Sequence, residues 1–380
     1  MKKLPFILIA FFMISRLPAQ WLTGSAQVKV NGRIQYDFVF LKRQHADRWQ
    51  IGNEFRRVHL SAAGRLPGRF DYKVEVNMAH GQIGFRDMFI RYNSKKWGQI
   101  AVGAMPEPTG LAMATSSKYI GFLERPMLTS LENFRWGAGL HYRYDALFDK
   151  RGGIQLALTN KGQNTHGFLD QDLDKGLNVA GRLYAVPFRN RRKHYLIHAG
   201  VNGASRPPKD LIVRPEDHLA GKYAYAFPGA TRRVETGGEM AAVFNNVAFQ
   251  AEYKESVIRN TIYKDFKVKG YYAQMSAFLT GEHRPYKKGA FGRVKPLHPV
   301  GKKHGTGAWE VLFRYSALEF SPDIRALNPD NPPALYNTAL GINWYPVSHV
   351  RIMYNYLITN DYNRTAGKLT HHLLRFQVDF

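Results

Sequence analysis

Basic side chains recur at every second position in several segments of this 380-residue chain, and this spacing places them on one face. Guanidinium groups donate two parallel hydrogen bonds and so suit phosphate and other oxyanions. Rings of Arg and Lys are also the usual lining of anion-conducting pores. If the polar faces line one lumen, its charged residues are Lys29, Arg33, Arg57, His59, Lys73, Arg91, Arg143, Arg314, Arg351 and Arg375, with Asp37, Asp71, Glu75, Asp87 and Glu310. Alternatively, these arginines and carboxylates simply pair across neighbouring strands.

The segments that carry these residues alternate apolar and polar side chains, which is typical of strands with one apolar face. Clear examples are 28–40, 70–78, 136–144, 309–316, 340–344 and 352–358. The last segment, 370–380, ends on Phe380 of its apolar face, as expected for a ring in a membrane-interface girdle. About sixteen such segments predict an all-β fold, a transmembrane antiparallel β-barrel with inward-folded loops.

The first twenty residues have the pattern of a secretory signal peptide. Lys2 and Lys3 precede the short apolar run 4–14, and small residues follow near Ala19. We therefore expect a signal peptide over 1–20 and a single barrel domain over 21–380. The chain has no cysteine and a net charge of +25. An exported barrel rarely meets nucleic acid, so the charge points to an anion-conducting lumen or to lipopolysaccharide phosphates.

The connections between the segments differ in length at the two ends of the barrel. Long stretches at 105–133, 160–176 and 204–231 all lie on the external side if the first strand runs outward. In 105–133 the apolar residues predict packing against the barrel wall, which places Lys118 in the path of ions; the alternative is a cap over the mouth. The stretch 280–306 is long but falls on the short-turn side. Either the strand count is off by one, or this segment folds into the lumen. We predict that part of it enters the barrel from the short-turn side and makes the electrostatic potential at that end of the pore more positive.

The chain resembles the phosphate-selective porins of the O and P type. The matching pieces, spread over nearly the whole chain, are GRIQ at 32–35, FRRVHL at 55–60, RDMFI at 86–90, TSSKYIGFLER at 115–125, GYYAQ at 270–274, LTGEHRPY at 279–286 and GAWEVLFRYS at 307–316. The resemblance implies a sixteen-stranded trimeric barrel whose anion-selective channel is narrowed by inward loops.

The resemblance also assigns residues to the narrow part of the channel. Arg56, Arg57, Asp87 and Lys118 match the constriction pattern, and Arg125 closes the fourth matching piece. Strict alternation, however, turns Arg57 inward and Arg56 toward lipid, where a charge is costly. Arg56 is therefore expected at the rim or beside a bulge. The full set of expected anion-binding or pore-lining residues is Arg33, Arg56, Arg57, Asp87, Lys118, Arg125, Arg143 and Arg314.

No nucleophile elbow, paired metal-ligand His motif or phosphate-cradling Gly loop is present in the sequence, so we expect neither an enzyme nor a cofactor. The sequence predicts an outer-membrane porin of a Gram-negative bacterium that passes small anions such as phosphate. We expect it to form a homotrimer, to contact membrane lipid and lipopolysaccharide, and not to bind nucleic acid. The alternative is a plugged barrel that anchors a surface complex or binds lipopolysaccharide.

Overall fold

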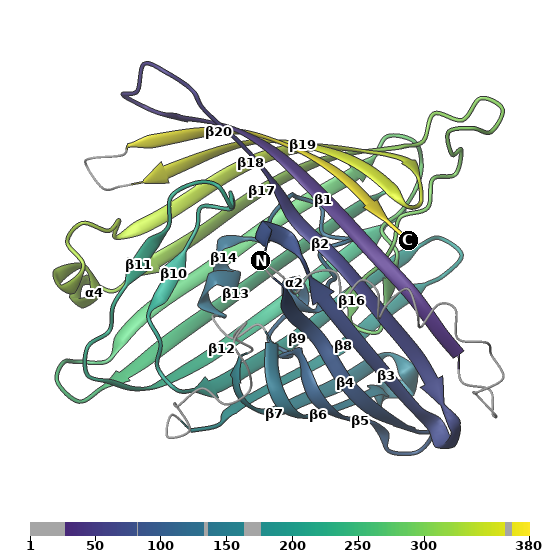
Figure 1. Ribbon diagram of the computed structural model, residues 1–380, viewed down its shortest axis with the longest axis horizontal. Coiled ribbons are helices and arrows are strands. Elements are labelled where there is room, and N and C mark those ends of the chain that lie inside the picture. Colours follow the sequence, from purple (N-terminus) through teal and green to yellow (C-terminus); the bar gives the residue numbers. More distant parts are fainter. Residues whose placement is uncertain (1–26, 82, 133–135, 163–175, 362–366) are drawn as a thin grey trace, which may run out of the picture.

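Sixteen strands of the described residues form one closed antiparallel barrel in the order of the sequence (Figure 1). The computed structural model describes residues 27–81, 83–132, 136–162, 176–361 and 367–380. The predicted signal peptide lies outside these residues. The barrel strands are β1 (Gln27–Arg43), β2 (Gln50–Leu66), β3 (Phe70–Asn77), β4 (Gly84–Ser94), β5 (Gly98–Pro106), β6 (Trp136–Ala146), β7 (Gly152–Gly162), β8 (Asn178–Asn190), β9 (Tyr195–Arg206), β12 (Ala230–Phe244), β13 (Val247–Asn260), β14 (Phe266–Phe278), β17 (Ala308–Phe320), β18 (Ala334–Val347), β19 (Val350–Asp361) and β20 (Lys368–Asp379).

The two faces of the strands follow the alternation of the sequence. In β1, Arg33, Gln35 and Asp37 are buried inside the barrel, whereas Ile34 and Phe40 are exposed on its outer surface. An outer surface of apolar side chains around a polar interior is what a bilayer requires of a barrel. The predicted number of strands and the predicted inward direction of their polar faces are therefore confirmed.

The barrel closes where β1 pairs with β20, from Arg33 opposite Asp379 to Arg43 opposite Leu369. Beyond this ladder, the amides of Gly32 and Phe380 donate to each other's carbonyl oxygens at 3.0 and 3.1 Å. The ring of Phe380 covers Gly32 so closely that a Cβ at that position would lie 2.2 Å from the ring. A side chain at position 32 would therefore displace the terminal ring, which remains 60% exposed on the outer surface.

The connections are long at one end of the barrel and mostly short at the other, as predicted, although most of the predicted long stretch 160–176 lies outside the described residues. The long-loop end carries the connections 107–135 and 207–229, and in outer-membrane barrels this end faces outward. The connection 279–307 starts from the short-turn end. The connections contain β10 (Leu211–Val213), β11 (Tyr223–Tyr225), β15 (Tyr286–Lys287), β16 (Ala290–Phe291), α2 (Leu111–Ala114), α3 (Leu147–Lys150), α4 (Pro322–Leu327), η2 (Pro67–Arg69), η3 (Ala79–Gly81) and η4 (Met127–Leu131). None of the helices in the described residues is long and apolar enough to cross a membrane.

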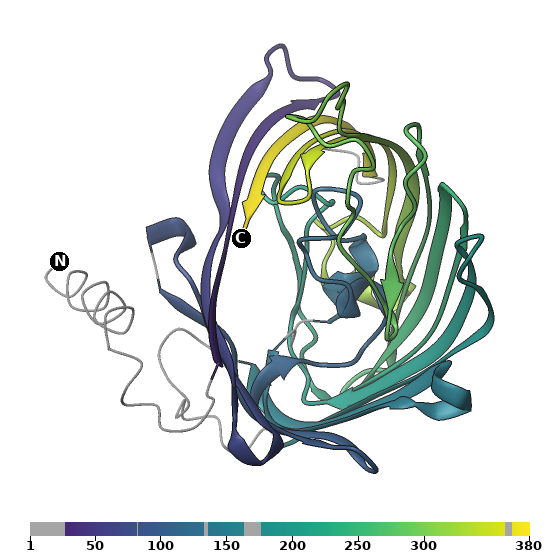
Figure 2. The same ribbon diagram turned by 90° about the vertical axis from the view of Figure 1, so that its right-hand side faces the viewer.

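Parts of the connections 107–135, 207–229 and 279–307, here called the inward segments, lie inside the barrel and pack along one half of its wall (Figure 2). Met127 and Leu131 pack with Leu211 and Val213 against the inner wall of β13, β14, β17 and β18. Phe122 and Leu123 pack against the wall formed by β1 and β17–β20. Leu111 meets Tyr286 and Phe291 against β8, β9, β12 and β13. The sequence-based expectations that 105–133 packs on the wall and that part of 280–306 enters the barrel are both confirmed.

Candidate functional site

An open cavity of about 840 Å³, here called the central cavity, lies between the β1–β7 wall and the inward segments. Among the described residues, eleven lysines and arginines and eight carboxylates line it. The basic residues are Arg33, Arg56, Arg57, Lys73, Arg86, Lys118, Arg125, Arg143, Lys209, Arg214 and Lys288; the acidic ones are Glu75, Asp87, Glu107, Glu124, Glu132, Asp210, Glu216 and Asp217. Seven of the eight residues predicted from the sequence therefore share one cavity; the exception is Arg314.

A β-bulge in β2 turns both Arg56 and Arg57 toward the interior. Gln35 of β1 pairs with Arg57 and Tyr36 pairs with Phe55, so Arg56 is the additional residue. A bulge places two residues opposite one and changes the side to which the chain points. Of the two positions expected for Arg56, the rim or a bulge, the structure shows the bulge.

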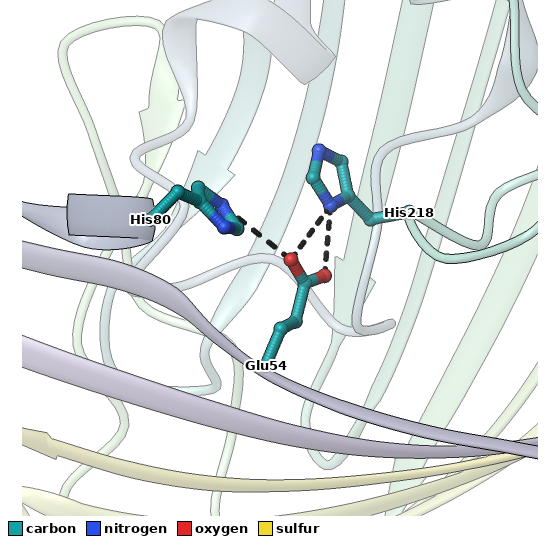
Figure 3. A group of neighbouring side chains, drawn as sticks. All are labelled: Glu54, His80 and His218. Atoms are coloured by element: carbon teal, nitrogen blue, oxygen red, sulfur yellow. Dashed lines mark hydrogen bonds and ion pairs between the residues drawn. The ribbon is translucent and has the colours of Figure 1, made fainter. Parts of the chain in front are cut away.

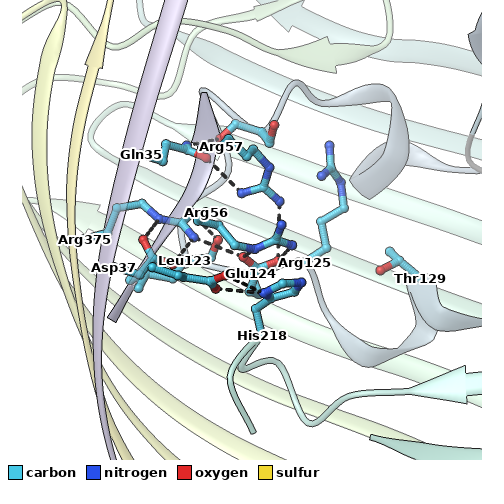
Figure 4. A network of polar contacts seen from close by, with 12 residues as sticks. Gln35, Asp37, Arg56, Arg57, Leu123, Glu124, Arg125, Thr129, His218 and Arg375 are labelled. Carbon is cyan, nitrogen blue, oxygen red and sulfur yellow. Dashed lines mark hydrogen bonds and ion pairs between the residues drawn. The ribbon is translucent and has the colours of Figure 1, made fainter. Parts of the chain in front are cut away.

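Glu124 of the 107–135 segment is the shared partner of three guanidinium groups (Figure 4). Arg56 binds it in a bidentate manner, with N–O distances of 2.8 and 3.0 Å. Arg57 Nη2 lies 3.5 Å from it and Arg375 Nη2 lies 3.0 Å from it. Burial opposes ionisation of this carboxyl group, but the guanidinium groups of Arg56, Arg57 and Arg375 hold its pKa well below the ordinary value of 4.5. Glu124 is therefore charged, and its single carboxylate forms ion pairs with three guanidinium groups.

The middle of the 107–135 segment places Lys118 at the central cavity, beside the barrel seam where β1 pairs with β20. Lys118 Nζ lies 3.6 Å from Asp379, which Arg293 of the 279–307 segment also binds. Arg33 Nη1 donates to Ser117 Oγ at 2.7 Å. Burial lowers the pKa of Lys118, and the nearby cations Arg33 and Arg293 lower it further against the attraction of Asp379. Lys118 is therefore held among like charges.

A second bulge positions Asp87. Glu75 of β3 lies opposite both Arg86 and Asp87 of β4, because Val74 pairs with Met88 and Val76 pairs with Phe85. Asp87 accepts hydrogen bonds from Lys73 Nζ and Trp136 Nε1, both at 2.7 Å. The guanidinium of Arg86 lies 4.4 Å from the centre of the Trp136 ring. The sequence pattern did not identify Arg86 as a lining residue, because the bulge changes its side.

A second cavity of about 400 Å³, here called the vestibule, opens at the short-turn end. Among its described lining residues, eight are basic and only Asp145 is acidic; the basic residues are Lys95, Arg143, Lys150, Arg151, Arg189, Arg191, Lys287 and Lys288. Arg143 and Lys288 line both cavities. Arg143 Nη2 donates to the carbonyl oxygen of Lys288 at 2.8 Å, so this contact lies at the boundary between them.

Arg125 and Arg314 stabilise the inward segments. Arg125 donates to the carbonyl oxygens of Ala112 and Thr115 at 2.9 and 2.7 Å while it borders the central cavity. Arg314 is not among the described residues that line that cavity. Its guanidinium lies 4.2 Å from the Phe122 ring centre and binds Glu216, because the inward segments cover this part of the wall.

Buried charges on the β8–β14 wall fix the 107–135 segment, and the sequence pattern missed them. Glu107 binds Arg206 at 2.5 Å and Glu132 binds Lys254. Glu252 accepts the amides of Leu111 and Ala112 at 3.0 and 2.6 Å. Their signal was present in the sequence, as charged residues on the inward face of β9 and β13.

Two histidines and a glutamate could hold a metal ion among the described residues. Glu54, His80 and His218 come from β2, η3 and the 207–229 segment, and their ligand atoms lie within 4.8 Å of one another. No local spacing in the sequence links them.

Comparisons with known proteins agree with this architecture. The sequence model of the family described as phosphate-selective porin O and P matches residues 28–380. Porin O of Pseudomonas aeruginosa is 25% identical over 372 residues, covering 87% of this chain and 82% of that protein. Among solved structures, an anion-selective porin from Comamonas acidovorans has a TM-score of 0.59 at 12% identity, covering 94% of this chain and all of that one. The trimer form of OmpT, an outer membrane protein of Vibrio cholerae, has a TM-score of 0.58 at 11% identity, covering 93% and 99%.

Proposed function

The chain belongs to the phosphate-selective porin O and P family and is an outer-membrane porin of a Gram-negative bacterium, and we propose that its channel selects anions and passes phosphate or other small anions passively. The observation that carries the proposal is the unequal pairing of charges in the central cavity. Three of its eight carboxylates pair with cations that do not themselves line it, and a fourth, Asp217, is held by His371. The three ion pairs are Glu107 with Arg206, Glu132 with Lys254, and Glu216 with Arg314.

Three of the eleven lining cations likewise pair with carboxylates outside the lining: Lys118 with Asp379, and Arg143 and Lys288 with Asp145. The other eight cations still outnumber the other five carboxylates. Around the bulge in β2 the excess is local, because Glu124 is shared by three guanidinium groups. An entering oxyanion can accept hydrogen bonds from Arg56 or Arg57 without displacing their only partner. Binding that is shared among several weak partners also permits release, which conduction requires.

The vestibule supports the same direction of selectivity. Its eight basic residues face a single described carboxylate, Asp145, and two of them, Lys287 and Lys288, come from the inward part of 279–307. We infer that the segment adds positive field where ions leave toward the short-turn end. Arg143 and Lys288, which line both cavities, then mark the passage from one to the other.

The alternative is a plugged barrel that anchors a surface complex or binds lipopolysaccharide. The packed half of the interior favours it, because three inward segments fill that half. The two cavities along the other half favour a channel. We further propose that the protein forms homotrimers, in line with the trimeric neighbour, and that its basic surplus contacts lipopolysaccharide phosphates.

Planar-bilayer recording tests this proposal. Purified protein should give discrete open-channel steps in potassium chloride, and added phosphate should reduce the chloride current in a concentration-dependent manner. Absence of steps from correctly folded barrels would support the plugged alternative. Open channels whose chloride current phosphate leaves unchanged would contradict phosphate binding in the channel.

A further inference from the structure

Glu54, His80 and His218 converge at the long-loop end of the barrel (Figure 3). His218 Nδ1 lies 2.8 and 2.9 Å from the two carboxylate oxygens of Glu54. His80 Nε2 lies 3.4 Å from Glu54 Oε2, on the other side of the carboxylate. The two imidazole rings are 5.7 Å apart between their centres. Two nitrogen ligands and one carboxylate are thus already assembled.

These separations are close to those around a tetrahedral zinc ion. With metal–ligand bonds of about 2.1 Å, neighbouring ligand atoms in a tetrahedron are about 3.4 Å apart. The His80–Glu54 separation of 3.4 Å has this value, and the His218–Glu54 separation of 2.9 Å to the same oxygen needs to open by about half an ångström. Three protein ligands with a fourth position for water are a common arrangement for zinc.

The surroundings permit a cation here. The Glu54 side chain is only 6% exposed, whereas the His80 side chain is 48% exposed, so an ion can enter from solvent on the His80 side. Arg56, two residues along β2, is engaged in its bidentate pair with Glu124.

An ion pair between His218 and Glu54 alone would suffice to hold the 207–229 segment to β2, but it leaves the position of His80 unexplained. His80 lies in a left-handed backbone conformation, with φ of 62°. That conformation is uncommon for residues other than glycine, although histidine adopts it more often than most. It directs the imidazole of the β3–β4 connection at the same carboxylate.

We propose that Glu54, His80 and His218 form a binding site for a divalent transition-metal ion, for which zinc is the best match. Imidazole and carboxylate ligands in tetrahedral geometry suit zinc, whereas magnesium and calcium prefer sets of oxygen ligands. The bound ion ties the β3–β4 connection and the 207–229 segment to β2. It also places positive charge at the long-loop mouth of the central cavity, which His218 borders.

Zinc titration of untagged, full-length protein in detergent tests the site. The protein is first stripped with a chelator, the chelator is removed, and zinc chloride binding is followed by calorimetry. We expect one saturable zinc ion per chain, and no competition from magnesium in large excess. Cobalt(II), used as a spectroscopic probe, should give the visible absorption of a tetrahedral site.

The variants His80→Ala, His218→Ala and Glu54→Gln should each weaken zinc binding at least about tenfold, since loss of even an outer-shell partner typically costs 10–100-fold. His45→Ala is the matched control, because His45 is exposed at the same end outside the cluster; it should leave the affinity unchanged. Heat-modifiable migration in gels confirms that each variant has folded. His80→Ala is decisive, because His80 lies in a partly exposed turn. If unmodified protein binds no zinc, or if folded His80→Ala binds it as tightly, the proposal is overturned.

Discussion

Neutralising Arg57 and Lys118 together should remove most of the anion preference of the channel. Around Glu124 and the β1–β20 pairing, the cations Arg56, Arg57, Arg375, Lys118 and Arg293 face the carboxylates Glu124, Asp37 and Asp379, and the neighbouring Arg33 pairs with Glu75. Six positive charges against four negative ones leave a surplus of two. The double variant Arg57→Gln/Lys118→Gln removes two positive charges and leaves each remaining cation of this set one carboxylate partner.

The size of the effect follows from Coulomb's law. A unit charge about 5 Å from a permeating ion changes its energy by about 0.8 kcal/mol in water, with opposite sign for anions and cations. Two charges therefore separate anion from cation by about 3 kcal/mol, and screening in about 0.1 M salt reduces this to about 2 kcal/mol. We expect the anion-to-cation permeability ratio to fall at least about tenfold, since about 1.4 kcal/mol corresponds to a factor of ten.

The assay is the reversal potential across a planar bilayer with a salt gradient, together with phosphate block of the chloride current. Arg65→Gln/Lys303→Gln is the matched control, because it also removes two positive charges, both from exposed residues outside the two cavities. The control should behave like the unmodified protein. A permeability ratio that stays the same in the folded Arg57→Gln/Lys118→Gln variant would refute the assignment of these two residues to the ion path.

Three further predictions concern assembly of the barrel, the inward segment 280–306, and the ion pairs of Glu124. Deleting Phe380 should reduce the amount of heat-modifiable barrel in the outer membrane, because the residue completes the β1–β20 seam over Gly32; normal amounts would contradict this. Shortening 280–306 should raise single-channel conductance and reduce anion preference, and a change in neither would show that the segment does not affect the ion path. Because the folded-state pKa of Glu124 is lowered, the stability from its ion pairs is present above pH 4.5 and is lost only as pH falls through the lowered value. Glu124→Gln should therefore increase protease cleavage within 107–132, and the difference from the unmodified protein should not shrink between neutral pH and pH 4.5; a difference that disappears above pH 4.5 would contradict the pKa direction.

The sequence predicted the barrel well because period-2 alternation records which face of a strand meets lipid. It also predicted that 280–306 folds inward, since the count of strands put a long connection at the short-turn end. For Arg56 the sequence exposed a conflict between adjacent arginines, and the bulge that resolves it could only be located with strand register in hand.

Alternation assigns a residue to a face but does not say what covers it. Arg314 is correctly placed on the inner face, yet Phe122 and Glu216 from inward segments cover its guanidinium. Glu54, His80 and His218 come from three separate segments, so no spacing rule could have joined them. Such sites depend on how long connections fold inside the barrel, which strand periodicity does not encode.

The most direct test of the central claim is the sign of the zero-current potential of unmodified protein in a planar bilayer with a potassium chloride gradient. The charge surplus in the central cavity and the vestibule predicts a potential close to the chloride equilibrium potential. A value near zero, or one close to the potassium equilibrium potential, would contradict an anion-selective channel.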